Sequence, residues 1–71
     1  MYQVFGHNKH NGSYIEYGFY YKYCEAMNRL DFLAQYLNSW QLRTDNGDLI
    51  DWISVYKINE NGEELIAAIY R

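Results

Sequence analysis

Two histidines and one cysteine are the side chains in this sequence best suited to binding a metal ion. His7 and His10 form an H-x-x-H pair, and Cys24 follows them as the single cysteine of the chain. A zinc site needs three or four such ligands in a suitable geometry. Two histidines in a polar hairpin loop usually face solvent instead, so we expect no metal and no other cofactor.

The acidic stretch Asp45–Asp48, followed by Asp51, suggests a calcium loop at first sight. An EF-hand places acidic ligands at positions 1, 3 and 5, a glycine at position 6 and a glutamate at position 12. With Gly47 at position 6, the ligand positions hold Leu42, Thr44, Asn46 and Ile53. The pattern therefore fails, and Asp-Asn-Gly predicts an ordinary turn, for which these residue types are suited.

Catalytic groups are not recognisable in the sequence. Cys24 has no histidine near it, and its place beside a predicted helical core face favours a small buried side chain over a nucleophile. The serines lack a nucleophile-elbow context, and Glu16 has no identifiable carboxylate partner. A chain this short also leaves little room for a deep substrate pocket. We expect a protein that is not an enzyme.

Aromatic and β-branched residues predict a first hairpin from strands 2–7 and 14–20. Asn11-Gly12 lies between them and is a strong signal for a two-residue hairpin turn. With that turn Val4 faces Phe19, and the predicted strands present two sets of side chains. One face carries Tyr2, Val4, Ile15, Tyr17 and Phe19, and the other carries Phe5, Tyr14, Glu16 and Tyr20.

Residues 22–40 change to a helical period and predict a helix that packs on a core. Its apolar positions are Tyr23, Met27, Leu30, Ala34 and Leu37, with Ala26 and Leu33 widening the same face. The expected core centre is Met27, Leu30 and Ala34. No Ser, Thr or Asp stands at its start to cap the first turn.

The region 49–70 predicts a second hairpin with its turn at Glu60-Asn61-Gly62. A three-residue loop would pair Asn59 with Glu63, and a two-residue loop would shift the pairing by one residue. Both registers remain open from the sequence. In the first, Ile53 and Val55 share a face with Leu65, Ala67 and Ile69, whereas Trp52, Tyr56 and Ile58 share the other with Ile66 and Tyr70.

The resulting order, β-β-α-β-β, predicts an α+β fold in which one helix packs on a four-stranded, mostly antiparallel sheet. The 71 residues form a single domain, 1–71, of which 20% are aromatic. The lone cysteine allows no internal disulfide, and no stretch approaches the length of a membrane span, so we expect a cytoplasmic protein. The net charge of −3, with basic residues evenly spread, argues against nucleic acid as a partner.

More aromatic residues are present than one helix and one sheet can cover. Phe32 lies opposite the helical core centre, and Tyr36 and Trp40 lie between it and the core edge. With a single helix, one sheet face must look outward, and its candidates are Phe5, Tyr14, Tyr20, Trp52, Tyr56 and Tyr70. Such aromatic patches are typical of protein interfaces, although tyrosines can also fill a small core with their hydroxyls in water. The predicted partner-binding residues are Phe32, Tyr36, Trp40, Tyr14, Tyr20, Trp52 and Tyr56.

These features favour a small protein-binding module, expected to be a homodimer through Phe32 and Tyr36. In its size, acidity, aromatic content and lack of catalytic groups the chain resembles the small inhibitor proteins of bacteriophages, such as anti-CRISPR proteins and uracil-DNA glycosylase inhibitors. The resemblance implies an inhibitor of a host defence protein acting by surface occlusion, and it rests on no aligned motif. Acidic residues could imitate phosphates, at Glu60, Glu63 and Glu64 and at Asp45, Asp48 and Asp51. The alternative is a single-stranded nucleic-acid-binding protein that uses aromatic residues of the sheet.

Overall fold

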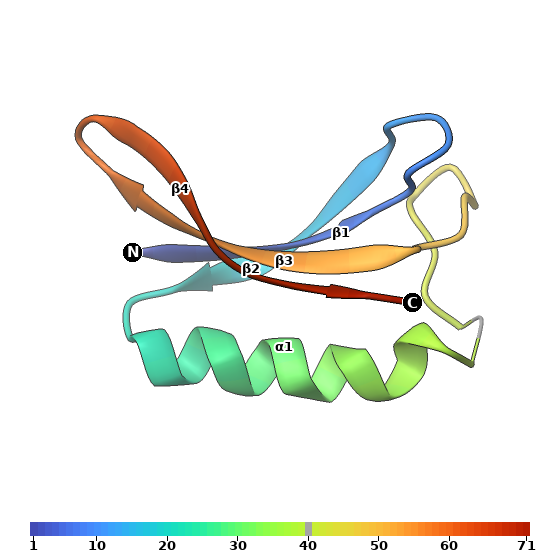
Figure 1. Cartoon of the computed structure of the whole chain (residues 1–71), viewed down its shortest axis with the longest axis horizontal. Coiled ribbons are helices and arrows are strands. Elements are labelled where there is room, and N and C mark those ends of the chain that lie inside the picture. Colours follow the sequence, from blue (N-terminus) through green and yellow to red (C-terminus); the bar gives the residue numbers. More distant parts are fainter. Residues whose placement is uncertain (40) are drawn as a thin grey trace.

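A computed structural model describes residues 1–39 and 41–71 of the chain. The elements are β1 (Tyr2–His7), β2 (Tyr14–Tyr20), α1 (Tyr23–Leu37), β3 (Trp52–Asn59) and β4 (Gly62–Tyr70). The strands form one sheet in the order β2-β1-β3-β4, every neighbouring pair is antiparallel, and α1 lies across one face (Figure 1). The α+β fold predicted from the sequence is confirmed.

The core lies between α1 and the inner face of the sheet. Its buried apolar residues are Val4, Ala26, Leu30, Leu33, Leu37, Ile50, Ile53 and Val55. The predicted core centre is only partly right: Leu30 is buried, but Met27 and Ala34 are half-buried at its margin. The helix is turned so that Leu33 faces the sheet in place of Ala34, which removes more apolar surface from water.

The helix is shorter at its C-terminus than the predicted span of 22–40. The chain leaves the helix after Leu37, where the Ser39 hydroxyl donates to the Tyr36 carbonyl oxygen at 2.7 Å and the Ser39 amide donates to the same oxygen at 3.2 Å. Serine competes in this way for helical carbonyl groups and favours helix ends. At the other end Lys22 is extended and provides no side-chain cap, as the sequence indicated. Trp40 lies outside the described residues.

The first hairpin has a different register from the predicted one. His7 pairs with Tyr14, which leaves a six-residue loop, 8–13, in place of a tight Asn11-Gly12 turn. The Asn8 side chain holds this loop open because its Oδ1 accepts hydrogen bonds from the amides of His10 (2.9 Å) and Asn11 (3.1 Å). A side chain that bonds its neighbours' backbone offers the chain an alternative to the two-residue turn.

A β-bulge further along this hairpin exchanges two aromatic residues between the faces. Val4 pairs with Gly18 but Phe5 pairs with Glu16, so Tyr17 is the extra residue in β2. Beyond the bulge Tyr20 packs against the core on the helix side, and Phe19 turns outward with 52% of its surface exposed. The predicted outward position of Tyr20 and inward position of Phe19 are therefore wrong, because an inserted residue reverses the alternation.

The same bulge brings the Tyr17 ring over β1 at Gly6. A Cβ atom at Gly6 would lie 2.7 Å from Cε2 of Tyr17 and 3.2 Å from two methyl carbons of Ile50. Only glycine leaves room there for this ring.

The second hairpin contains both of the registers that the sequence left open. At its tip Asn59 pairs with Gly62, which is the two-residue turn, whereas Val55 pairs with Ala67 in the register of the three-residue loop. A bulge at Ile66 joins the two segments. Its consequence is that Ile66 packs against the core and Leu65 faces outward with 50% exposure. The assignment of these two residues to the opposite faces was wrong for this reason.

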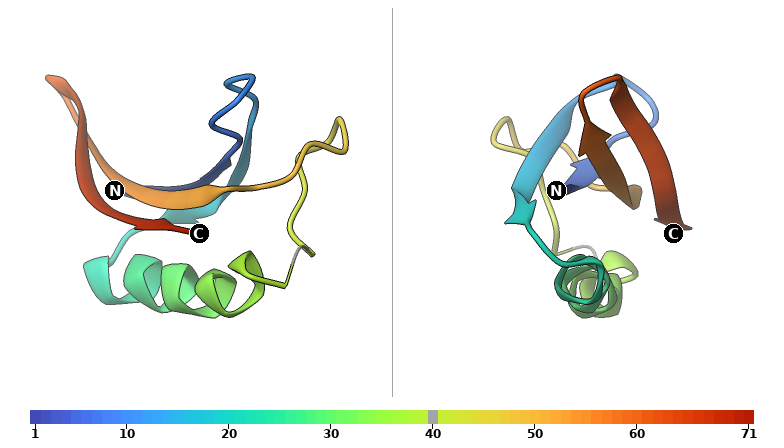
Figure 2. Two further views of the ribbon diagram at one scale, coloured as in Figure 1. Left: turned by 45° about the vertical axis from the view of Figure 1, so that its right-hand side comes forward. Right: turned by 90° about the vertical axis from the view of Figure 1, so that its left-hand side faces the viewer.

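The bulges also bend the sheet. A bulged strand curves and twists more strongly than a regular one. Both hairpins rise away from α1 at their ends, so the face of the sheet opposite the helix is concave (Figure 2). We call this concave outer face the trough.

Candidate functional site

The floor of the trough is a connected group of ring side chains from all four strands. Alternation along each strand turns these residues away from the helix. The group consists of Phe5, His7, Tyr14, Trp52, Tyr56 and Tyr70. No other element of the described chain packs over this face (Figures 1 and 2).

Three of these rings form a stack that crosses three strands. His7 pairs with Trp52, and Trp52 pairs with Tyr70, so the register places the three side chains in one row. The His7 and Trp52 ring centroids lie 3.7 Å apart with an angle of 12° between the planes. The Trp52 and Tyr70 centroids lie 5.3 Å apart at 20°. The row presents a flat, partly exposed aromatic surface.

Phe5 is the centre of the second half of the group. Its ring lies 5.8 Å from that of Tyr14, at 76°, and 5.7 Å from that of Tyr56, at 80°. Edge-to-face contacts of this kind are a favourable geometry for aromatic pairs. Phe5 also lies 5.9 Å from His7, which links the two halves of the trough.

His7 is held in place by polar as well as aromatic contacts. Its Nε2 lies 2.7 Å from Oγ of the fully buried Ser54. Partial burial lowers the pKa of the His7 imidazole below its usual value of 6.5, because desolvation disfavours the charged form. His7 is therefore mainly neutral at pH 7.

The expectation that His7 is a solvent-facing loop residue is wrong. His7 ends β1, two positions after Phe5, and strand alternation puts both on the trough face. The alternation of the predicted strand 2–7 indicates this position for His7, whereas the H-x-x-H spacing on its own indicates metal binding. Within residues 1–39 and 41–71, no three His, Cys, Asp or Glu side chains gather as they would around a metal ion.

Two hollows flank the His7–Trp52 pair. One, of about 250 Å³, is lined by Phe5, His7, Tyr14, Tyr56 and Glu63. The other, of about 420 Å³, is lined by His7, Asn8, Lys9, Gly12, Trp52 and Tyr70. The first has a carboxylate at its edge and the second an ammonium group, so the trough changes charge along its length.

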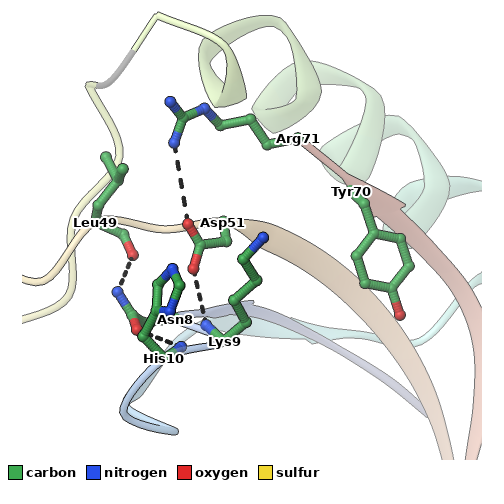
Figure 3. Close-up of a pocket in the computed structure, with 7 residues that line it drawn as sticks. All are labelled: Asn8, Lys9, His10, Leu49, Asp51, Tyr70 and Arg71. Carbon is green, nitrogen blue, oxygen red and sulfur yellow. Dashed lines mark hydrogen bonds and ion pairs between the residues drawn. The ribbon is translucent and has the colours of Figure 1, made fainter.

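A third and more polar hollow, of about 540 Å³, lies beside the end of the trough (Figure 3). Asp51 organises it: Oδ2 accepts from the Lys9 amide at 2.8 Å, and Oδ1 lies 4.0 Å from Nη1 of Arg71. Nδ2 of Asn8 donates to the Leu49 carbonyl oxygen at 2.8 Å. These contacts join the loop after β1 to the segment before β3, so we interpret Asn8 and Asp51 as structural.

The acidic loop before β3 forms the turn predicted from the sequence. Gly47 has a φ of 86°, and its amide donates to the Thr44 carbonyl oxygen at 2.9 Å. Oγ1 of Thr44 accepts from the Asp48 amide at 3.1 Å, and the Asp48 carboxylate accepts from the Ser13 hydroxyl at 3.0 Å. Asp48 is thus bonded to the neighbouring loop of the first hairpin.

The helix carries a second and smaller aromatic surface on its flank, beside its buried face. Phe32 is 46% exposed, and its ring centroid lies 5.3 Å from that of the half-buried Tyr36. The Arg29 guanidinium lies over the Phe32 ring, 5.2 Å from its centroid. Nε of Arg29 is buried and has no hydrogen-bond partner among the described residues. We call Arg29, Phe32 and Tyr36 the helix patch.

The seven predicted partner-binding residues therefore do not form one surface. Tyr14, Trp52 and Tyr56 meet in the trough, and Phe32 and Tyr36 lie on the helix patch. Tyr20 belongs to the margin of the core, and Trp40 lies outside the described residues. Cys24 is exposed, so its predicted burial is wrong. The rotation of the helix about its axis that brings Leu33 to the sheet points Cys24 away from the sheet.

Comparisons with known proteins give no relative for this chain. No protein-family model, no curated protein and no solved structure matches it. In the part of the chain that the structure describes, no helix is long and apolar enough to cross a membrane. The trough and the helix patch are consequently the features that bear on the function of this chain.

Proposed function

We propose that this chain is a non-enzymatic protein-binding module that covers a surface of its partner with the trough. The supporting observation is the row of ring side chains along a concave sheet face that no other element covers within the described residues. Tyrosine and tryptophan give large contact areas at small cost in conformational entropy, and they are enriched at protein interfaces. Steric occlusion is the mode of action that this proposal implies, as in small inhibitor proteins.

The rings are also already positioned for binding. Trp52 is fixed between His7 and Tyr70, and Phe5 between Tyr14 and Tyr56. Side chains that are ordered before association lose less entropy when a partner binds. A protein that acts by occlusion benefits from this, because affinity comes from the contact itself. A host protein in the cytoplasm is the partner class we favour.

Site-specific photocrosslinking tests the trough as the binding surface. A benzophenone amino acid would replace Tyr70 or Leu65, which are 66% and 50% exposed on the trough face, in cells that make the chain. We expect one and the same protein to be crosslinked from both positions. The matched control is Tyr21, which is 82% exposed in the turn before α1 and should give no such product.

Three results would count against the proposal. Equal crosslinking from Tyr21 would mean that capture is unspecific. Capture from Tyr21 or from the helix patch alone would place the partner on another surface. A Tyr70→Ala variant that retains full affinity for the crosslinked protein would likewise remove the trough from the interface.

Single-stranded nucleic acid is a second candidate, and one feature favours it. The stacked row of His7, Trp52 and Tyr70 is a flat surface on which nucleobases can stack, and Lys9 lines the adjoining hollow. The net charge of −3 opposes it. A titration of the chain with fluorescent oligothymidine at low and high salt tests this candidate. Binding that weakens strongly with salt supports it, and absence of binding removes it.

A further inference from the structure

The smaller hollow of the trough has the composition of a cation-binding site. Phe5, Tyr14 and Tyr56 line it, and the rings of both tyrosines stand nearly perpendicular to that of Phe5, at 76° and 80°. His7 and Glu63 complete the lining. We call this hollow of about 250 Å³ the aromatic box.

The β-bulge in the second hairpin brings Glu63 to the box. Between the bulge and the turn, Glu63 pairs with Ile58, and Leu65 pairs with Tyr56 on the trough face. The hairpin also rises over the trough at this end (Figure 2). Glu63 therefore reaches a hollow whose other lining residues come from β1, β2 and β3.

The charge of the box is negative at neutral pH. Glu63 is its only acidic lining residue, and none of the described lining residues is Lys or Arg. Burial keeps the pKa of His7 below 6.5, so its ring adds little positive charge. Glu16, the strand partner of Phe5, puts a further carboxylate on the same face and accepts a hydrogen bond from Gln3 at 2.7 Å.

These features together favour a cationic occupant. Aromatic faces carry negative electrostatic potential, and a cation held over them within about 6 Å of a ring centroid is attracted. A carboxylate at the rim adds a charge-assisted hydrogen bond to an ammonium or guanidinium group. An anionic group such as phosphate would meet the repulsion of Glu63.

We propose that the aromatic box binds an arginine or lysine side chain of the protein partner. The inference rests on the proposed function, and it adds the chemistry by which the trough selects a surface to cover. The aliphatic stem of such a side chain packs on apolar rings while its charged end meets Glu63. The partner would accordingly present a basic residue that projects from its surface.

Small model compounds test the box without the partner. The probes are N-acetyl-arginine amide and its neutral isostere N-acetyl-citrulline amide, titrated separately into the whole chain and followed by NMR chemical shifts. We expect the arginine compound to shift resonances of Phe5, Tyr14 and Tyr56, with at least about fivefold higher affinity than the citrulline compound. A lysine analogue, N-acetyl-lysine amide, should shift the same resonances.

Two substitutions connect that binding to the box. Glu63→Gln removes the charge, and Tyr14→Leu removes an aromatic face at a position that is 65% exposed. Each should weaken binding of the arginine compound at least about threefold. The matched controls, Glu64→Gln and Tyr21→Leu, change an exposed carboxylate on the same hairpin and an exposed tyrosine outside the trough, and should have no effect.

The inference is overturned if citrulline binds the box as well as arginine does, or if the two box variants behave as their controls. It is also overturned if thymidine 5′-monophosphate shifts the box resonances more strongly than the arginine compound. These outcomes differ from failure of the proposed function. Crosslinking from Tyr70 and Leu65 with no preference for arginine would leave the trough as an interface and reject the box alone.

Discussion

At the scale of single residues, His7 connects the chemistry of the trough with its stability. Its imidazole is stacked on Trp52 and bonded to the buried Ser54, and it is partly withdrawn from water. A charged form would lose solvation on folding, and this is why the folded chain lowers the pKa of His7.

We predict that acid weakens the fold through His7. The unfolded chain, with a His7 pKa of 6.5, binds the proton more readily than the folded chain. The stability that the neutral His7 contributes to the fold is fully present above pH 6.5, and it is lost as the pH falls through the lower pKa of the folded state. Urea unfolding at several pH values should show a falling free energy of unfolding over this range. In His7→Gln the slope over the same range should flatten, and an unchanged slope would contradict the prediction.

Asp51 illustrates a residue whose charge serves the structure. It is 8% exposed, its carboxylate accepts a hydrogen bond from the Lys9 amide, and it forms an ion pair with Arg71. We predict that Asp51→Ala lowers the free energy of unfolding by about 1–3 kcal/mol, because the amide loses its acceptor. Asp51→Asn retains an acceptor oxygen and should lose less.

Chemical denaturation of these two variants beside Asp45→Ala provides the comparison. Asp45 is an exposed residue of the acidic turn, and its replacement should change stability by no more than about 0.5 kcal/mol. Equal losses for Asp51→Ala and Asp45→Ala would show that the contacts of Asp51 contribute nothing.

At the scale of elements, α1 is a helix that depends on its buried face. It has no side-chain N-cap and no basic residue in its last turn, so packing on β1 and β3 has to supply most of its stability. Leu30, at 1% exposure, lies near the centre of that contact.

We predict that Leu30→Ala costs about 2–5 kcal/mol through lost burial and the cavity it leaves. A domain of this size has a total stability of order 5 kcal/mol, so the variant should be largely unfolded or melt far below the wild type. Thermal unfolding followed by circular dichroism measures this. Asn28→Ala, on the exposed side of the same helix, should melt close to the wild type. An unchanged melting temperature for Leu30→Ala would refute the observed helix phase.

At the scale of the whole molecule, the trough and the helix patch are separate surfaces: the trough is the sheet face turned away from α1, and the patch lies on the flank of α1, beside its buried face. A chain that binds its partner through the trough can therefore self-associate through the helix at the same time. In the helix patch, Arg29 covers part of Phe32 and leaves 46% of that residue in water. Burying the rest in a two-fold dimer would contribute about 1 kcal/mol per chain.

We predict a homodimer that buries Phe32 and Tyr36 at its two-fold axis. Light scattering should give the wild type twice the mass of one chain and give Phe32→Glu the mass of a monomer. Gln35→Glu adds the same charge to an exposed helix position and should leave the dimer intact. A wild type that is monomeric would refute the prediction. Loss of folding in Phe32→Glu, seen by circular dichroism, would contradict the exposed position of Phe32.

The sequence by itself determined the order of elements, the α+β class and most of the inner and outer side chains. These follow from local periodicity: alternation predicts strands, and the spacing of Leu30 and Leu37 predicts the helix. Phe5, Tyr14, Trp52, Tyr56 and Tyr70 were assigned to the outer face on the same basis, and the structure places them there.

Only the tertiary structure decided the registers, the helix phase and the shape of the binding face. The bulges at Tyr17 and Ile66 allow each hairpin to close its loop and at the same time to pack its apolar residues against the helix. Whether both can be achieved depends on the whole fold. The bulges reversed Tyr20 and Leu65, brought Glu63 beside the aromatic rings and curved the sheet into a trough. Local patterns carry no information on such insertions, because one extra residue leaves the alternation on either side of it intact.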